Sequence, residues 1–263
     1  MSTTPTASAN ETATATSRGR TIKRIVVGVL IVPLAVFLVI ELFALQAEQQ
    51  TEQKRRSIAM VGGRIETERR VPMWLQSIAG PNSHSFLDRN CLVRVTMSGD
   101  KISDEQLATV QGLPDLVSLD LEDSLVTSAG MEVVAKLTSL ESLKLAGSKV
   151  TDVAPLAQLP NLKTLILNFS DIRQEAFGSL AEFPSLRNLG ASGLKLDDQG
   201  IELLAKCPHL EELSINGATL GEHGLVPLLA QKGLKFLSLK DAIVNVADVA
   251  DFKKAMPGCK VVP

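Results

Sequence analysis

The stretch Leu140–Leu162, LESLKLAGSKVTDVAPLAQLPNL, contains the two patterns that decide how this chain folds. Its first half has the frame L-x-x-L-x-L, in which Leu143 and Leu145 are two residues apart and so point to one side of a short strand. Its second half spaces apolar residues three apart, which is typical of one face of a helical segment. The stretch therefore predicts one strand followed by one helical turn.

The same leucine frame recurs through the second half of the chain. We number the positions of each unit from the first leucine of the frame, which gives starts at Leu92, Leu116, Leu140, Leu162, Leu186, Leu210 and Leu234, with a truncated eighth unit at Cys259. Successive starts differ by 24, 24, 22, 24, 24, 24 and 25 residues. A nearly constant period in this range predicts a solenoid of stacked units.

Each unit is predicted to contain a strand and a convex helical segment. The residues at positions four and six face a thin apolar core, and the residue at position eleven turns the chain back over it. Pro114, Pro160, Pro184 and Pro208 end the helical segments two residues before the next strand frame. In the 22-residue third unit, Pro155 favours a tighter, 3₁₀-like segment. The expected architecture is a right-handed α/β coil with a parallel sheet on its concave side and helices on its convex side.

These units resemble bacterial leucine-rich-repeat proteins of the T-D-x-G-L type. The matching residues in the third and fifth units are Gly147, Val150, Thr151, Asp152, Asp197, Asp198, Gly200, Ile201, Leu204, Cys207 and Pro208. The repeats are also similar to those of F-box adaptors, but no F-box segment precedes them. Position nine departs from the family, because in units two to seven it is Ser, Leu or Ala instead of the usual asparagine. The turns should therefore be satisfied by hydroxyls, by the backbone or by helix starts.

A long apolar run near the N-terminus predicts a membrane anchor. Residues 25–45 contain one charge in 21 residues and would span about 31 Å as a helix. A cleaved signal peptide is the competing interpretation, but the run is longer than usual and lacks a small-x-small site. Four basic residues precede it, which places the N-terminus in the cytoplasm and the C-terminal domain outside it.

The predicted division of the chain follows from these features. It comprises a disordered cytoplasmic tail (1–21), a transmembrane helix (22–46), a juxtamembrane helical spacer ended by Gly62 and Gly63 (47–62), an N-terminal cap (63–91), seven leucine-rich repeats (92–258) and a truncated repeat (259–263). Within the cap we expect a strand at residues 64–71, a short helix at 72–79 and a loop at 80–90.

Composition excludes several functional classes. The net charge of −2 and the isoelectric point near 6.0 argue against nucleic-acid binding. The three cysteines are too scattered for a metal or redox motif, and we expect them to be free thiols. His209 and His223 have no acid or nucleophile placed beside them by the sequence. We therefore expect neither an enzyme nor a bound cofactor or metal.

The concave face is the expected contact surface, and it is formed by positions three, five and seven. The candidate partner-binding residues are Arg94, Asp120, Lys144, Ile166, Asn168, Phe169, Gly190 and Phe236. Ile166 and Phe169 stand out as apolar beside Gly190, whose missing side chain would leave a gap for a partner backbone. Cross-strand pairs such as Asp120 with Lys144 have a simpler interpretation, which is that they only solvate the sheet.

The sequence therefore favours a membrane-anchored interaction module. The partner would be another protein or a cell-envelope polymer, and the chain would be monomeric or weakly associating. The main alternative is a structural envelope component without a specific ligand. An adaptor for substrate recognition in a larger complex is a third hypothesis.

Overall fold

The computed structural model describes residues 32–70 and 89–263. The chain divides into two compact units, residues 1–50 and 51–263, and each is considered by itself. The first described element is the helix α2 (Val32–Met60). The predicted tail (1–21), the first part of the predicted membrane span (25–31) and the predicted helix at 72–79 lie outside the described residues. Within residues 32–70 and 89–263, no helix is both long and apolar enough to cross a membrane.

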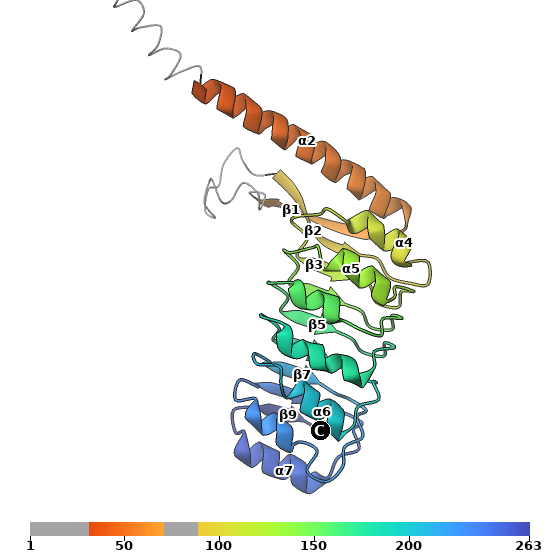
Figure 1. The fold of residues 1–263 in the computed structure, drawn as a ribbon, viewed down its shortest axis with the longest axis vertical. Helices are drawn as coiled ribbons and strands as arrows, with labels where there is room; N and C mark the ends of the chain where they lie inside the picture. Colours follow the sequence, from red (N-terminus) through yellow and green to blue (C-terminus); the bar gives the residue numbers. More distant parts are fainter. Residues whose placement is uncertain (1–31, 71–88) are drawn as a thin grey trace, which may run out of the picture. The chain divides into compact units, whose positions relative to one another are not determined.

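One nine-stranded sheet runs through the second unit, with its strands in sequence order (Figure 1). The strands are β1 (Arg64–Arg70), β2 (Arg89–Thr96), β3 (Ser118–Asp120), β4 (Ser142–Lys144), β5 (Thr164–Ile166), β6 (Asn188–Gly190), β7 (Glu212–Ser214), β8 (Phe236–Ser238) and β9 (Lys260–Val262). β1 pairs antiparallel with β2, and every later pair is parallel. The predicted parallel sheet is therefore confirmed, and β2 begins at Arg89, inside the predicted loop.

The strand register confirms the seven unit starts and corrects the eighth. Position three of every unit lies opposite position three of the next, from Arg94 through Phe236. Phe236 in turn lies opposite Lys260, which places the eighth start at Gly258, 24 residues after Leu234. The predicted start at Cys259 was wrong by one residue. Because Gly258 has no side chain for the core, the buried Cys259 thiol occupies that end of the core instead.

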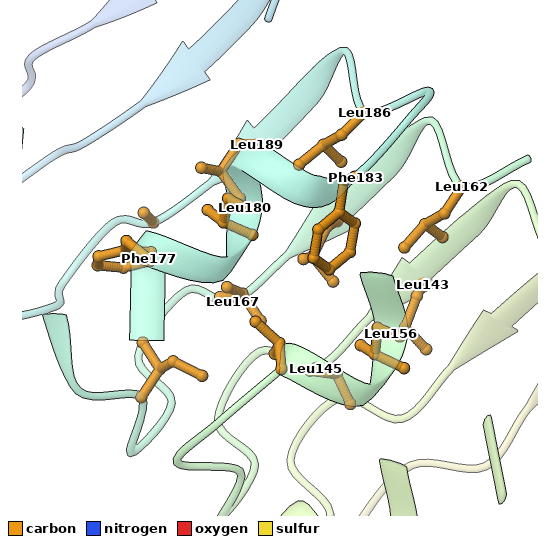
Figure 2. Close-up of a cluster of buried hydrophobic side chains, with 14 of the residues drawn as sticks. Leu143, Leu145, Leu156, Leu162, Leu167, Phe177, Leu180, Phe183, Leu186 and Leu189 are labelled. Carbon is orange, nitrogen blue, oxygen red and sulfur yellow. The ribbon is translucent and has the colours of Figure 1, made fainter. Parts of the chain in front are cut away.

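The core is a single column of apolar side chains between the sheet and the helical segments. Figure 2 shows a section of it, in which Leu143 of β4 and Leu145, directly after that strand, meet Leu156 of η4. All three side chains are fully buried, as are Phe177 and Leu180 in the next unit. The predicted inward positions four and six are confirmed, and the scarcity of aromatic residues matches a core that is only one or two side chains deep.

Helical segments cover the other face of the sheet. They are α4 (Asp104–Leu107), η2 (Ala108–Val110), η3 (Ser128–Gly130), α5 (Met131–Val134), η4 (Ala154–Gln158), η5 (Gln174–Glu182), α6 (Asp198–Leu204), η6 (Val226–Ala230) and α7 (Val246–Ala255), where η denotes 3₁₀ helix. The 3₁₀ segment expected at Pro155 is present. It is not unique to the short unit, because η5 and η6 in full-length units are also 3₁₀.

The 3₁₀ geometry makes a short convex segment possible but does not by itself account for the 22-residue unit, because the 24-residue sixth unit has a 3₁₀ segment of the same length, five residues. A 3₁₀ helix rises about 2.0 Å per residue and an α-helix about 1.5 Å. The five residues of η4 therefore cover about 10 Å, close to the distance that the seven residues of α6 cover.

Aspartate side chains join neighbouring units on the helical side. At position thirteen, Asp104 accepts the Thr127 backbone N–H at 3.0 Å, and Asp198 accepts the Gly221 N–H at 2.9 Å, each from the next unit. Position fifteen of that next unit must be glycine to leave room. A Cβ on Gly224 would lie 2.6 Å from Asp198 Oδ1. This bridge gives the Asp-x-Gly part of the repeat its physical reason.

The N-terminal end of the sheet is closed by α2 and β1. α2 ends at Met60, as predicted, and Gly62 follows with a left-handed φ of +85°. Gly63 lies against Ile58, because a Cβ there would be 2.5 Å from Ile58 Cγ2. Ile58 is fully buried and belongs to the solenoid core. The last turns of this helix are therefore part of the folded domain.

Candidate functional site

The sheet face opposite the core, which we call the open face, carries positions three, five and seven of each unit. It is the face predicted to be concave. Its side chains are mostly half-buried serine, threonine and asparagine. Arg94 lies at its N-terminal end, where it pairs with Glu66 across β1 and β2. This contact ties Arg94 to the neighbouring strand.

Asp120 and Lys144 are brought together as predicted. They lie opposite each other on β3 and β4, with Lys144 Nζ 3.2 Å from Asp120 Oδ2 and 3.7 Å from Glu122 Oε1. The hydrogen bond to Asp120 raises the pKa of Lys144 above its ordinary value, with further support from the Glu122 charge. One cation thus faces two carboxylates, and the cluster keeps a net negative charge. A cross-strand ion pair can also serve only to keep the sheet surface hydrated. The pair is therefore compatible both with a contact site and with a solvated sheet face.

The predicted gap beside Gly190 is not present. Gly190 lies opposite Ile166 on the neighbouring strand and is buried. A Cβ on Gly190 would lie 3.0 Å from Asn168 Oδ1 and 3.1 Å from Ile166 Cδ1. The long side chains of the fourth unit therefore lean over the glycine and fill the space. Gly190 accommodates its neighbours within the chain and offers no opening to a partner.

Position seven carries a polar ladder that sequence reasoning missed. Asn168 Oδ1 accepts the Ser192 N–H at 2.8 Å, and Asn216 Oδ1 accepts the Lys240 N–H at 2.9 Å. Between them, Ser192 Oγ accepts the Asn216 N–H at 3.4 Å. The asparagines absent from position nine thus act two positions earlier. The signal was in the sequence, because position seven reads Asn, Ser, Asn in units four to six.

The turn at position nine is closed mainly by the backbone. The Ser148 N–H donates to the Leu145 carbonyl at 3.1 Å, and equivalent bonds recur at Ser170 and Ala218. Ser170 Oγ also donates to the Leu167 carbonyl. The hydroxyls of Ser124 and Ser148 are buried without a hydrogen-bond partner. Of the three expected ways to satisfy this turn, the backbone is therefore the general one.

Position eight forms a row of left-handed residues along one edge of the sheet. We call this the turn row, and its members are Gly99, Asp123, Gly147, Phe169, Gly193, Gly217 and Asp241, with φ of +100°, +56°, +68°, +56°, +71°, +76° and +56°. Glycine adopts this conformation freely, and aspartate tolerates it better than most residues. A bulky phenylalanine there is a genuine conformational outlier.

Phe169 is the most distinctive candidate on the molecule. Its side chain is 72% exposed. The ring lies over Gly193 of the next unit, where an added Cβ would be 2.2 Å from the ring carbons Cδ1 and Cε1. Asp123 lies over Gly147 in the same way, 2.3 Å from an added Cβ. The row thus pairs each of these two large residues with a glycine that makes room for it.

Phe236 is not close to this site. It lies half-buried on β8 between Glu212 and Lys260 on the flanking strands. Three strand spacings separate β5 from β8, which is about 14 Å. The structure therefore brings together Ile166, Asn168, Phe169 and Gly190, brings together Asp120 and Lys144, and leaves Arg94 and Phe236 apart.

A second charged ladder runs along position two. Lys163 Nζ lies 2.8 Å from Glu141 Oε2, and Glu211 pairs with both Lys235 and Arg187. These two cations, Lys235 foremost, lower the pKa of the Glu211 carboxyl. The ladder has three cations (Lys163, Arg187 and Lys235) and two carboxylates (Glu141 and Glu211), so both acids are paired and one positive charge is in excess. The pairs join neighbouring strands.

In the described part of the chain, His209, His223 and the cysteines do not gather into a catalytic arrangement. Contrary to the sequence-based expectation, an acid does lie beside His223, whose Nδ1 is 3.5 Å from Asp248 Oδ1. Asp248 also accepts the His223 backbone N–H at 2.7 Å, which makes the pair a turn contact. Cys207 and Cys259 are buried free thiols, and Cys91 is also buried. Among residues 32–70 and 89–263, no three acidic, histidine or cysteine side chains gather to hold a metal ion.

Comparisons with known proteins return structural similarities alone. No family model matches the chain, and no curated protein matches it. Among solved structures, internalin C2 of Listeria monocytogenes is 20% identical with a TM-score of 0.48, over 73% of this chain and 91% of that one. A leucine-rich-repeat protein of Leptospira interrogans is 20% identical with a TM-score of 0.46, over 59% of this chain and 38% of that one.

An internalin F of Listeria monocytogenes is 20% identical with a TM-score of 0.45, over 59% of this chain and 49% of that one. The described residues show a repeat solenoid directly. The strand register repeats every 24 residues apart from the 22-residue unit, and the leucine frame points into one continuous core.

Proposed function

We propose that this chain is a protein-interaction module that contacts its partner through the open face and the adjoining turn row. The observation that carries the proposal is Phe169, which is 72% exposed and held in a left-handed conformation. Left-handed bulky residues cost roughly 1–2 kcal/mol and are concentrated at functional sites. Aromatic side chains, phenylalanine included, are also enriched at the cores of protein interfaces.

Hydrogen bonds and ion pairs within the chain hold the rest of the open face in place around this anchor. The position-seven ladder and the Asp120–Lys144 pair engage its polar groups within the chain. A partner would therefore meet a surface that needs little reordering, which lowers the entropic cost of association. A cell-envelope polymer remains the alternative ligand, and a purely structural role or an adaptor role remain the alternative functions.

Membrane attachment through residues 25–45 belongs to the same proposal. Within the described part of this run, Leu38, Leu42 and Leu45 of α2 are exposed at spacings of four and three, along one side of the helix. Exposed leucines in such a row favour burial in lipid or against another helix. The C-terminal domain would then lie outside the cytoplasm. Protease digestion of intact cells tests this, because a domain on the cytoplasmic side would stay protected.

The interaction proposal is tested by charge substitution at the anchor. Phe169→Asp together with Ile166→Asp should abolish cross-linking to a partner in cells that make the protein. Val226→Asp is the matched control, since Val226 is also exposed but belongs to η6 on the helical side. If the double variant cross-links as well as the parent protein does, the result favours the alternative that the chain is a structural component without a specific ligand.

A further inference from the structure

Beyond the Phe169 ring, the turn row is bare at Gly217, between Gly193 and Asp241. Gly193 carries the edge of the Phe169 ring, and a Cβ on Gly217 would have nothing within 4 Å. Two units correspond to about 10 Å along the row. The exposed ring thus stands at one end of a shelf whose floor is glycine backbone, and Asp241 marks the far end. A partner main chain can approach such a floor closely.

The groups beside this shelf are hydrogen-bond donors. Asn168 and Asn216 use their side-chain oxygens to accept the N–H groups of Ser192 and Lys240. This fixes each side-chain orientation, and among the described residues neither Nδ2 has an acceptor. The Ser192 hydroxyl oxygen is likewise occupied as an acceptor. The site therefore offers oriented donors and few free acceptors.

The charges beside the shelf are mainly positive. Lys195 follows Gly193 by two residues, and Lys240 lies next to Gly217, whose N–H donates to the Lys240 carbonyl. Both lysines are exposed, and no carboxylate of the described residues pairs with either. Asp171, the nearest acid in position ten, is paired with Lys149 at 3.3 Å. Asp241 is the opposing charge.

From this arrangement we infer that the shelf from Phe169 to Gly217 binds an extended acidic segment of a partner protein that carries an apolar side chain. The apolar side chain packs on the Phe169 ring, and the two asparagine amides donate to partner carbonyls. Lys195 and Lys240 attract the carboxylates. A polypeptide that carries carboxylates fits better than a neutral polysaccharide, because Lys195 and Lys240 are exposed and no carboxylate of the described residues pairs with them. This inference rests on the proposed function and moves the main contact from the sheet floor to its edge.

Selection from random short peptides displayed on phage tests the inference with the full-length protein. The expected result is enrichment of peptides rich in Asp and Glu that contain at least one apolar residue. Synthetic copies should bind Phe169→Gly at least about tenfold more weakly, a change typical of removing an interface anchor. This variant keeps the left-handed backbone without strain, so lost binding does not reflect lost folding. Added salt should weaken binding to the parent protein.

Charge variants supply the matched control. Lys195→Glu and Lys240→Glu should weaken binding, whereas Lys101→Glu, at an exposed lysine of the first unit, should not. Selected peptides that bind Phe169→Gly as well as the parent, or that are basic, would overturn the inference. So would failure to select any peptide, or Phe169-dependent binding of a neutral glucan instead. A different result separates the two proposals. Peptides that bind Phe169→Gly normally but do not bind Ile166→Asp would contradict binding at the shelf, while still supporting binding through the open face.

Discussion

At the residue scale, Phe169 combines an unfavourable left-handed backbone conformation with a close side-chain contact to the next unit. Every other member of the turn row is glycine or aspartate, the residues that suit a positive φ. The Phe169 ring occupies the space that Gly193 leaves free. The conformation and the contact are therefore coupled, and neither residue can be changed without affecting the other.

A double-mutant cycle measures this coupling. Phe169→Gly should leave the free energy of unfolding unchanged or raise it by about 1 kcal/mol, because strain is relieved. Gly193→Ala should lower it by about 1–3 kcal/mol, because the new Cβ meets the ring and a positive φ. Gly193→Ala in the Phe169→Gly background should cost less, since only the backbone strain remains. Urea unfolding of the four proteins gives the comparison, and strictly additive effects would contradict the contact.

Glu211 provides a pH-dependent test at the same scale. Lys235 and Arg187 lower its pKa in the folded state below the ordinary value of 4.5. A carboxyl with a depressed pKa stabilises the fold above the unfolded pKa and loses that effect as the pH falls through the folded one. Glu211→Gln should therefore be less stable than the parent at pH 7, and the difference should shrink in acid below about pH 4. Chemical denaturation at both values checks this, and a difference that grows in acid would exclude it.

At the element scale, the units are joined differently on the two sides of the sheet. On the open side, asparagine and serine side chains accept N–H groups of the next strand end. On the helical side, aspartates at position thirteen accept backbone N–H groups of the next unit. Glycine at position fifteen of that unit leaves room for the carboxylate. Both devices act between neighbours only, so each unit depends on the one beside it.

The helical bridge can be tested in the fifth and sixth units. Asp198→Ala removes the acceptor for the Gly221 N–H and should lower the free energy of unfolding by about 1 kcal/mol. Gly224→Ala places a Cβ against Asp198 Oδ1 and Leu220 Cβ and should cost about 1–3 kcal/mol. Combining the two should recover part of the loss, because the carboxylate no longer blocks the methyl group. Thermal unfolding supplies the measurement, with Gly178→Ala as the control, since its nearest neighbour would be 3.8 Å away.

At the scale of the whole molecule, the solenoid has one continuous core and two unlike ends. The N-terminal end is closed by the antiparallel strand β1 and by Ile58 of α2. The last described strand, β9, has a neighbour on one side only within the sheet. In stacked repeats each unit is stabilised by its neighbours, so terminal units open more readily than central ones.

Cysteine labelling of the native protein reports this gradient. Burial raises the pKa of both the Cys207 and the Cys259 thiol, which slows their reaction with reagents. Cys259 adjoins the terminal strand β9, whereas Cys207 is fully buried between units. Cys259 should therefore be modified first, and Cys207 only at a rate set by wider unfolding. Mass spectrometry of labelled peptides gives the order, and simultaneous labelling would indicate that the solenoid opens as a whole.

The leucine frame determined the repeats, the parallel sheet, its register and the inward side chains. These follow from the sequence because a strand alternates its side chains and a fixed period stacks equivalent residues. The 24-residue period also predicted that Asp120 lies opposite Lys144. The leucine frame failed at the eighth start, because Gly258 interrupts it and the thiol of Cys259 made the next residue look like its first member.

What only the tertiary structure decided is how the spaces between units are filled. The sequence showed that Gly190 lacks a side chain, but not that Ile166 and Asn168 lean over it. It showed Phe169 as an apolar residue at a turn, but not its left-handed backbone or its place over Gly193. Period and pattern locate a residue along a strand and on a face. Rotamers and contacts depend on the neighbouring unit, which lies more than twenty residues away and meets the first only after the coil has closed.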